Sequence, residues 1–229
     1  RYYTFLIDIY ATKNLQDMVY QMGRCIVNRL KSKGLDAIDR FLQFVSSLRT
    51  GITFDGQGNA SWNLGLGDIK SPSFTLEEIF NYLNAADKHC IVAIDEFQAI
   101  NDYPEQNVEA LLRTYVQDCR NAVFVFSGSQ KRMMSEMFSS PARPFYQSTS
   151  FMFLKPVELS EYEAFAKHHF DLGNKQIADG VVKAIYDRFD GTTWYLQKVL
   201  NQIYATTDHA LVDDVDNSGG GIICQNEDS

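Results

Sequence analysis

The stretch CIVAIDEF at residues 90–97 decides the fold of this protein. Its first five residues are apolar and three of them are β-branched, a composition typical of a strand buried inside a parallel sheet. Two acidic residues, Asp95 and Glu96, follow where the strand leaves the sheet. In open α/β sheets, ligands bind beyond the carboxyl ends of the strands. We therefore expect the functional site beside these two acids.

The pair of adjacent acids has two interpretations. In a P-loop ATPase, the first acid holds Mg²⁺, usually through water, and the second polarises the attacking water molecule. These roles would fall to Asp95 and Glu96. The alternative is a strand that ends in a solvated acidic turn. Taken alone, so short a pattern does not separate the two.

Length and composition narrow the class of protein. The chain has 229 residues, of which 45% are hydrophobic, which suits one large α/β domain with or without a small appendage. A net charge of -8 argues against general binding to nucleic-acid phosphates. No apolar run approaches the roughly 20 residues that span a bilayer, and the 4 cysteines fit no zinc spacing. We expect a cytoplasmic protein whose partners are neither membranes nor nucleic acid.

Three further apolar runs predict strands, at residues 3–10, 122–126 and 151–154. Small polar residues, Ser127 to Gln130, end the second of these runs, at the same edge of the sheet as Asp95. Strand–helix alternation with right-handed crossovers produces a parallel sheet. We therefore predict a three-layer α/β fold with helices on both faces of the sheet. The helices predicted from apolar spacing before the last strand cover residues 15–33, 35–49, 75–88, 107–121 and 131–138.

The other segments predict the domain organisation. Residues 51–67 alternate with period two around a Gly-rich turn, which indicates a β-hairpin inserted into the α/β core. Three helices, at 160–170, 176–189 and 194–206, follow the sheet without an intervening strand and predict a small helical lid. The acidic, Gly-rich tail has little to bury and is expected to be flexible. The predicted parts are a core at 1–157, a lid at 158–207 and a tail at 208–229.

Four blocks of the sequence carry a recognisable pattern. They are IVAIDEFQAI (91–100), VFVFSGSQKRMMSEMF (123–138), SSPARPFYQSTSFMFLKPVELSEYEAF (139–165) and FDGTTWYLQKVLNQIY (189–204). In this order they resemble blocks of the bacterial and archaeal AAA+ ATPases of the STAND type, a family of P-loop NTPases, and Bacteroides-type members most of all. The resemblance covers about residues 3–204. It implies a P-loop NTPase-like core with a lid, in a protein that uses ATP binding and hydrolysis as a conformational switch.

The resemblance implies roles for individual residues of the core. Asp95 is the acid associated with Mg²⁺, through water, and Glu96 is the acid that activates water. Ser127 or Ser129 is the first sensor of the γ-phosphate. Arg143, in the loop before the predicted strand at 151–154, is a candidate contact to phosphate or to a neighbouring subunit.

In the lid, the resemblance implies a nucleotide contact at the Gly191 turn, which opens the helix that follows the nucleotide. Family members usually carry a proline shortly after this glycine, whereas this sequence has Thr192 and Thr193. This difference puts the lid contacts in question. ATP and Mg²⁺ are the implied ligands of the full-length protein.

One motif of the family does not occur in this sequence. The phosphate loop GxxxxGK[ST] supplies the backbone N–H groups, the lysine and the hydroxyl that hold phosphate and Mg²⁺, and the sequence contains no Gly-Lys-Ser or Gly-Lys-Thr. In the family this loop follows an internal strand, which would lie between the strands predicted at 122–126 and 151–154. We therefore expect these residues to belong to a longer protein, and to bind ATP weakly by themselves.

The alternative hypothesis is a non-catalytic interaction or regulatory module on the same fold. In that case Asp95 and Glu96 are surface acids, and the hairpin at 51–67 or the Met-rich helix at 131–138 is a docking surface for a protein partner or for self-association.

Overall fold

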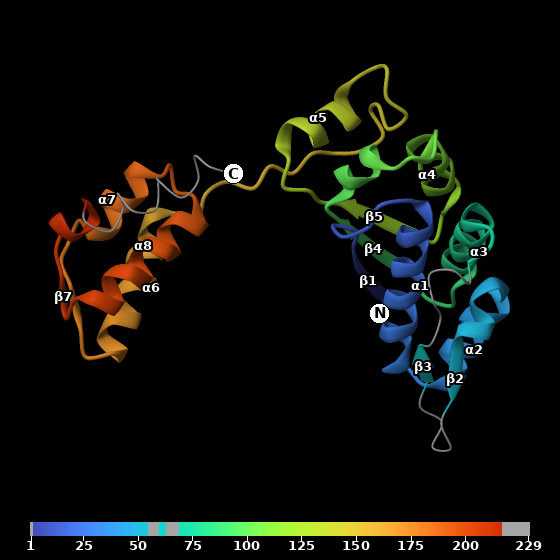
Figure 1. Ribbon diagram of the computed structural model, residues 1–229, viewed down its shortest axis with the longest axis horizontal. Coiled ribbons are helices and arrows are strands. Elements are labelled where there is room, and N and C mark those ends of the chain that lie inside the picture. The colour runs from blue at the N-terminus through green and yellow to red at the C-terminus, as the bar shows by residue number, and fades with distance from the viewer. Residues whose placement is uncertain (1, 55–59, 63–68, 217–229) are drawn as a thin grey trace. The chain divides into compact units, whose positions relative to one another are not determined.

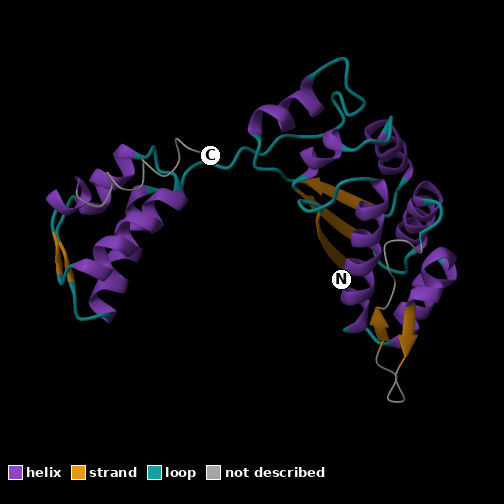
Figure 2. Ribbon diagram, in the orientation of Figure 1, coloured by secondary structure: helices purple, strands orange, loops and turns teal. Residues whose placement is uncertain are grey.

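The computed structural model describes residues 2–54, 60–62 and 69–216. It divides into two compact units, Arg1–Ser150 and Phe151–Ser229 (Figure 1). The first unit is an α/β domain and the second is mainly helical (Figure 2). The boundary between the units lies before the position expected from the sequence, because residues 151–157 do not join the sheet.

The first unit is built around a parallel sheet of three strands. These are β1 (Tyr3–Asp8), β4 (Cys90–Asp95) and β5 (Ala122–Phe126), in the order β1-β4-β5. All three were predicted from apolar runs, and the α/β class with a parallel sheet is confirmed. The register places Asp8 beside Asp95 and Ile94 beside Phe126, so the carboxyl ends of the strands meet at one edge.

Helices connect these strands across one face of the sheet (Figure 1). Asn14 caps the first of them, since its side chain accepts a hydrogen bond of 2.8 Å from the Asp17 N–H. The first helix packs against β1 and against the second and third helices. The helical segments of this unit are α1 (Leu15–Lys31), α2 (Leu35–Phe44), η1 (Ser46–Gly51), α3 (Pro72–Ala85), η3 (Phe97–Asp102), α4 (Val108–Asp118) and α5 (Lys131–Ser139).

The other face of the sheet is exposed in the described residues, whereas helix–strand alternation predicted helices on both faces. Leu6 is 70% exposed and Val123 64% exposed, while Phe5 and Ile7 on the opposite face are buried. The strand order explains this difference. Because β1, β4 and β5 lie side by side in chain order, both connections cross in the same direction, and right-handed crossovers in one direction place their helices on one face.

The predicted hairpin is present. β2 (Ile52–Phe54) pairs antiparallel with β3 (Ala60–Trp62), and Ile52 lies opposite Trp62. The rest of the predicted hairpin segment, at 55–59 and 63–67, lies outside the described residues.

The strand predicted at 151–154 does not form. This segment carries no strand, and Met152, Phe153 and Leu154 are exposed. A strand needs a hydrogen-bonding partner, and within the described residues β5 pairs only with β4.

The second unit contains the three predicted helices, α6 (Leu159–Leu172), α7 (Val181–Arg188) and α8 (Thr193–Thr206). Two features differ from the prediction. The helix expected from residue 176 begins at Val181, because β6 (Gln176–Ile177) pairs parallel with β7 (His209–Ala210). Residues 208–216, expected to be a flexible tail, are ordered, since Ala210 and Val215 are buried in the core of this unit. Residues 217–229 of the expected tail lie outside the described part of the chain.

Glu78 is expected to be a strong determinant of stability. It is 6% exposed on α3, and its carboxylate accepts hydrogen bonds from the backbone N–H groups of Ser46 and Ser47, at 3.0 and 3.3 Å, and from both serine hydroxyls. Glu78→Ala would leave these donors without an acceptor, which is expected to lower the free energy of unfolding by about 2–4 kcal/mol. Urea denaturation measures the loss. Glu77→Ala, at the exposed neighbouring position, is the matched control, and an equal effect of both variants would contradict the prediction.

Tyr103 is expected to make stability fall at alkaline pH. Its hydroxyl is buried and hydrogen-bonded to the hydroxyl of Thr12, and burial raises its pKa to about 12. Between pH 10 and 12 the unfolded chain loses this proton while the native protein keeps it. Stability therefore falls with pH, by up to about 1.4 kcal/mol per unit. Urea denaturation between pH 9 and 11.5 measures how the free energy of unfolding changes with pH, and this dependence should be weaker for Tyr103→Phe. Tyr10→Phe, which changes an exposed tyrosine, is the control and should keep the pH dependence of the unsubstituted protein. An unchanged pH dependence for Tyr103→Phe would contradict the prediction.

Candidate functional site

Polar side chains meet where β4 and β5 end. Two backbone hydrogen bonds join the chain beyond these strands, from Ser127 N to Ile94 O at 3.0 Å and from Phe97 N to Ser127 O at 2.9 Å. They bring the acids that follow β4 beside the serines that follow β5. Parallel order in the sheet therefore produces the predicted group of four side chains from sequence positions more than 30 residues apart.

Asp95 is held by two donors. Its Oδ1 accepts a hydrogen bond of 2.7 Å from the Ser127 hydroxyl and one of 3.0 Å from the Glu96 backbone N–H. The backbone carbonyl of Asp95 accepts a hydrogen bond of 3.2 Å from Ile9 N, just after β1. A carboxylate beside a hydroxyl, at the carboxyl edge of a parallel sheet, is a donor set that suits hydrated Mg²⁺, which keeps several waters and takes one or two carboxylates.

Glu96 adopts a left-handed backbone conformation, with φ at 56° and ψ at 40°. A residue other than glycine in this region costs on the order of 1 kcal/mol, and surrounding contacts must maintain it. The side chain is held as well. Its Oε2 accepts a hydrogen bond of 2.9 Å from the Ser129 hydroxyl and another from the side-chain amide of Gln98.

Phe97 anchors the turn directly after Glu96. Its ring is fully buried, with centroids 4.3 Å from Phe126, 5.6 Å from Phe145 and 6.0 Å from Phe138. These rings come from β5, α5 and the loop after α5. The cluster therefore fixes the direction in which the chain leaves β4, and with it the position of Glu96.

Arg143 belongs to the same unit but makes no direct contact, in the described residues, with the four polar side chains at the ends of β4 and β5. Its Nη2 is 2.7 Å from Glu109 Oε2 and also donates to Asn101 Oδ1. Burial raises the pKa of the Glu109 carboxyl, and the Arg143 guanidinium opposes that rise. Both contacts lie within its own chain, so a contact to phosphate or to another subunit stays a prediction.

Sequence reasoning did not single out Gln98, Asn101 and Glu109. Gln98 stands two residues after Glu96 and contacts it because η3 turns the chain back towards the acid. The sequence signal available was the position of Gln98 inside the block at 91–100. Asn101 and Glu109 had no such signal, because their roles depend on the loop that carries Arg143.

Gly191 belongs to the second unit and begins the turn into α8, as predicted. Its φ is 68°, and an added Cβ would lie 2.7 Å from the Tyr186 ring and 2.8 Å from Pro156. Glycine is therefore required here both by the backbone conformation and by the space.

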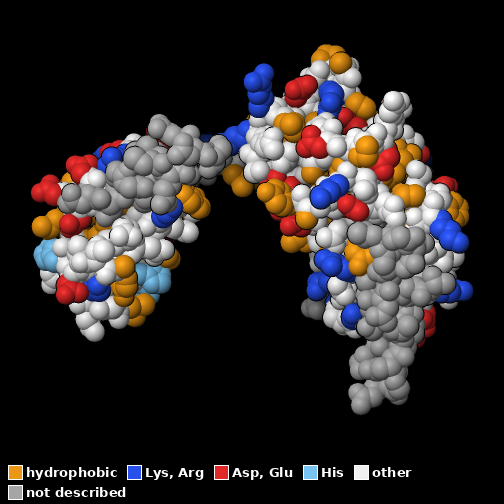
Figure 3. Space-filling model, viewed as in Figure 1, with side chains coloured by type: hydrophobic (Ala, Val, Ile, Leu, Met, Phe, Trp, Pro, Cys, Tyr) orange, Lys and Arg blue, Asp and Glu red, His pale blue; other side chains and the backbone are white. Residues whose placement is uncertain are grey.

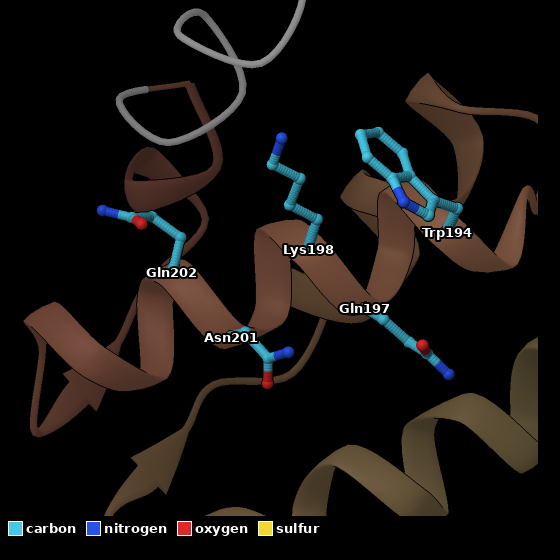
Figure 4. A pocket seen from close by; sticks show the side chains of 5 residues that line it. All are labelled: Trp194, Gln197, Lys198, Asn201 and Gln202. Carbon is cyan, nitrogen blue, oxygen red and sulfur yellow. The ribbon is translucent and has the colours of Figure 1, made fainter.

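A shallow pocket on α8 contains none of the predicted site residues. The side chains that line it extend from one helix, and Lys198 Nζ lies 4.6 Å from the centre of the Trp194 ring (Figure 4). The lining residues are Trp194, Gln197, Lys198, Asn201 and Gln202.

Within residues 2–54, 60–62 and 69–216, no three His, Cys, Asp or Glu side chains are grouped as direct metal ligands. In the same ranges, no helix has the length and apolar character needed to cross a membrane. On the face seen in Figure 3, Lys and Arg side chains are interspersed with Asp and Glu.

The parallel sheet and the helices on one of its faces make the first unit an α/β domain, and the fold of the chain is similar to that of P-loop ATPases of known structure. One is a Walker-type ATPase of Pyrococcus abyssi, with a TM-score of 0.61 and 17% identity over 99% of this chain and 63% of that one. Another of the similar structures is the ORC2 protein of Aeropyrum pernix in its ADPNP–ADP complexes, with a TM-score of 0.51 and 13% identity over 94% of this chain and 51% of that one.

The chain thus spans less than two thirds of the length of either protein. No family model matches it, and no curated protein sequence matches it. At these identities the similarity establishes the fold.

Proposed function

We propose that this chain is the core and lid portion of an ATP-binding, ATP-hydrolysing switch protein of the AAA+ STAND type. The observation that carries the proposal is the pairing of Asp95 with Ser127 and of Glu96 with Ser129, at the carboxyl edge of a P-loop ATPase-like sheet. This edge is where open α/β sheets bind their ligands. ATP is the proposed ligand, and the sequence resemblance supports the STAND assignment.

Each residue has a distinct role in this proposal. Asp95 would hold hydrated Mg²⁺, with the Ser127 hydroxyl orienting its carboxylate. Glu96 would accept a proton from the attacking water, and Ser129 would place the Glu96 carboxylate. A Mg²⁺ ion held in this way would neutralise the charge that develops on the phosphates during hydrolysis.

The phosphate loop is the part that this sequence does not supply. We propose that it follows a strand located further upstream in the native protein, which would pair with the free edge of β5. Two observations support this: the sequence has no GxxxxGK[ST] motif, and in the described residues β5 has a strand on one side only. The free edge of a strand leaves backbone donors and acceptors unpaired, so an additional strand would stabilise the sheet.

Calorimetry with Mg²⁺–ATP tests the proposal on two proteins, this chain and the same chain preceded by its native upstream sequence. We expect binding by the longer protein and weak or no binding by the chain alone. Asp95→Asn in the longer protein should weaken binding with Mg²⁺ much more than binding without it. If neither protein binds ATP, the ATPase proposal is wrong.

A second candidate function is an interaction module on the same fold. The exposed apolar side chains of one sheet face, Leu6, Val123 and Val125, favour it, because parallel sheets are ordinarily covered on both faces. Absence of ATP binding by both proteins, together with self-association or capture of a protein partner that Val123→Lys abolishes, would support this function instead.

A further inference from the structure

Gln98 is a buried polar residue for which the proposed chemistry has no role as yet. It lies in η3 and is 4% exposed. Its amide nitrogen donates to Glu96 Oε2, while no donor among the described residues reaches its Oε1. A buried acceptor without a donor costs on the order of 1–3 kcal/mol. The amide therefore faces Glu96 at a cost in stability.

The orientation of the Gln98 amide follows from its partner. A carboxylate can only accept hydrogen bonds, so the nitrogen must face Glu96 and the oxygen must point away. The oxygen points towards Gly128, where an added Cβ would lie 2.1 Å from it. A residue larger than glycine at position 128 would displace the amide, so Gly128 provides the space that this orientation needs.

The η3 turn, which carries Gln98, is also stabilised by contacts that do not involve Glu96. Asn101 Nδ2 donates to the Gln98 backbone carbonyl at 3.0 Å, and the Oδ1 of Asn101 accepts from Arg143. Arg143 is paired in turn with Glu109 at 2.7 Å. A continuous series of contacts therefore runs from the Arg143–Glu109 ion pair to the carboxylate of Glu96.

We propose that Gln98 is a positioning residue for Glu96. Its amide and the Ser129 hydroxyl together fix the direction in which the Glu96 carboxylate points, and Gly128, Asn101 and Arg143 keep the amide in place. The inference rests on the proposed function, because it assigns Gln98 a part in orienting the acid that activates water. A general base contributes only when it is aligned with its proton, and small misplacements cause large losses in rate.

The first test needs no nucleotide. In the ¹⁵N-labelled chain, the side-chain NH₂ signals of Gln98 should be shifted downfield and protected from exchange by the bond to Glu96. Glu96→Ala should remove both effects, and Gly128→Ala should weaken them by displacing the amide. Glu136→Ala, which removes an exposed carboxylate from α5, is the control and should leave the signals unchanged. Signals that do not respond to Glu96→Ala would overturn the proposal.

The second test measures steady-state ATP hydrolysis by the protein with its native upstream sequence. Gln98→Met keeps the size of the side chain but removes its donors, and should lower kcat by about 10- to 100-fold with KM for ATP unchanged. Gln43→Met, at an exposed position of α2, should leave both constants unchanged. An increase in KM at constant kcat would overturn the positioning role. If the unsubstituted protein binds no ATP, the proposed function fails, and the NH₂ signals still decide whether Gln98 holds Glu96.

Discussion

Glu96→Gln is expected to abolish ATP hydrolysis by the protein with its native upstream sequence, while Mg²⁺–ATP still binds. A general base contributes about 10²- to 10⁴-fold to rate, so kcat should fall by at least about 100-fold. Glutamine retains a side-chain oxygen that can accept from Ser129, so the turn at the end of β4 should keep its structure. Phosphate release measures the rate, and calorimetry measures the retained affinity.

Glu136→Gln is the matched control, because this carboxylate is exposed on α5. It should leave kcat within about twofold of the unsubstituted protein, as expected for a surface substitution away from the site. Hydrolysis by Glu96→Gln at the unsubstituted rate would assign water activation to another group. Loss of ATP binding together with hydrolysis would instead mean that Glu96 holds the ligand.

Phe97→Ala is expected to cause a large loss of stability in the first unit. The ring is fully buried against Phe126, Phe138 and Phe145, and removing such a ring costs about 3–5 kcal/mol. The left-handed conformation of Glu96 depends on this anchor, so the candidate site should lose its order as well. Urea unfolding measures the free energy of unfolding, and the NMR signals of the β4 and β5 backbone amides report on the first unit alone.

Phe74→Ala is the matched control for this substitution. Phe74 lies on α3 and is exposed, so its removal should change the free energy of unfolding by less than about 0.5 kcal/mol. The loss in free energy of unfolding for Phe97→Leu should lie between the losses for Phe97→Ala and Phe74→Ala, because leucine fills part of the volume of the removed ring. A loss below about 1 kcal/mol for Phe97→Ala would show that the aromatic cluster does not anchor the turn.

The sequence by itself determined the parallel α/β core and the sheet edge at which the four candidate site residues lie. Residues 90–94 are uninterruptedly apolar, which suits a strand covered by neighbours, and Asp95 and Glu96 must then stand at its carboxyl end. The same reasoning applied to β5 placed Ser127 and Ser129 beside them. These inferences succeed because strand direction and periodicity are local properties of the chain.

Only the tertiary structure decided which segments with strand or helix potential take that form. Residues 151–154 have strand composition, but no strand in the described part of the chain pairs with them. Gln176–Ile177, in contrast, leave the predicted helix because β7 pairs with them. A pattern shows which conformation a segment favours, and its backbone hydrogen bonds need a partner that lies far away in sequence.

The positioning of Glu96 was likewise decided by tertiary structure. Gln98 reaches the carboxylate only because η3 turns back beneath it, and Arg143 meets Asn101 and Glu109 only after the loop beyond α5 has folded onto the domain. Such contacts depend on side-chain directions that no periodicity encodes. The sequence therefore indicates which side chains stand at the carboxyl ends of the strands. The packing around Phe97 and Gln98 determines the directions in which these side chains point.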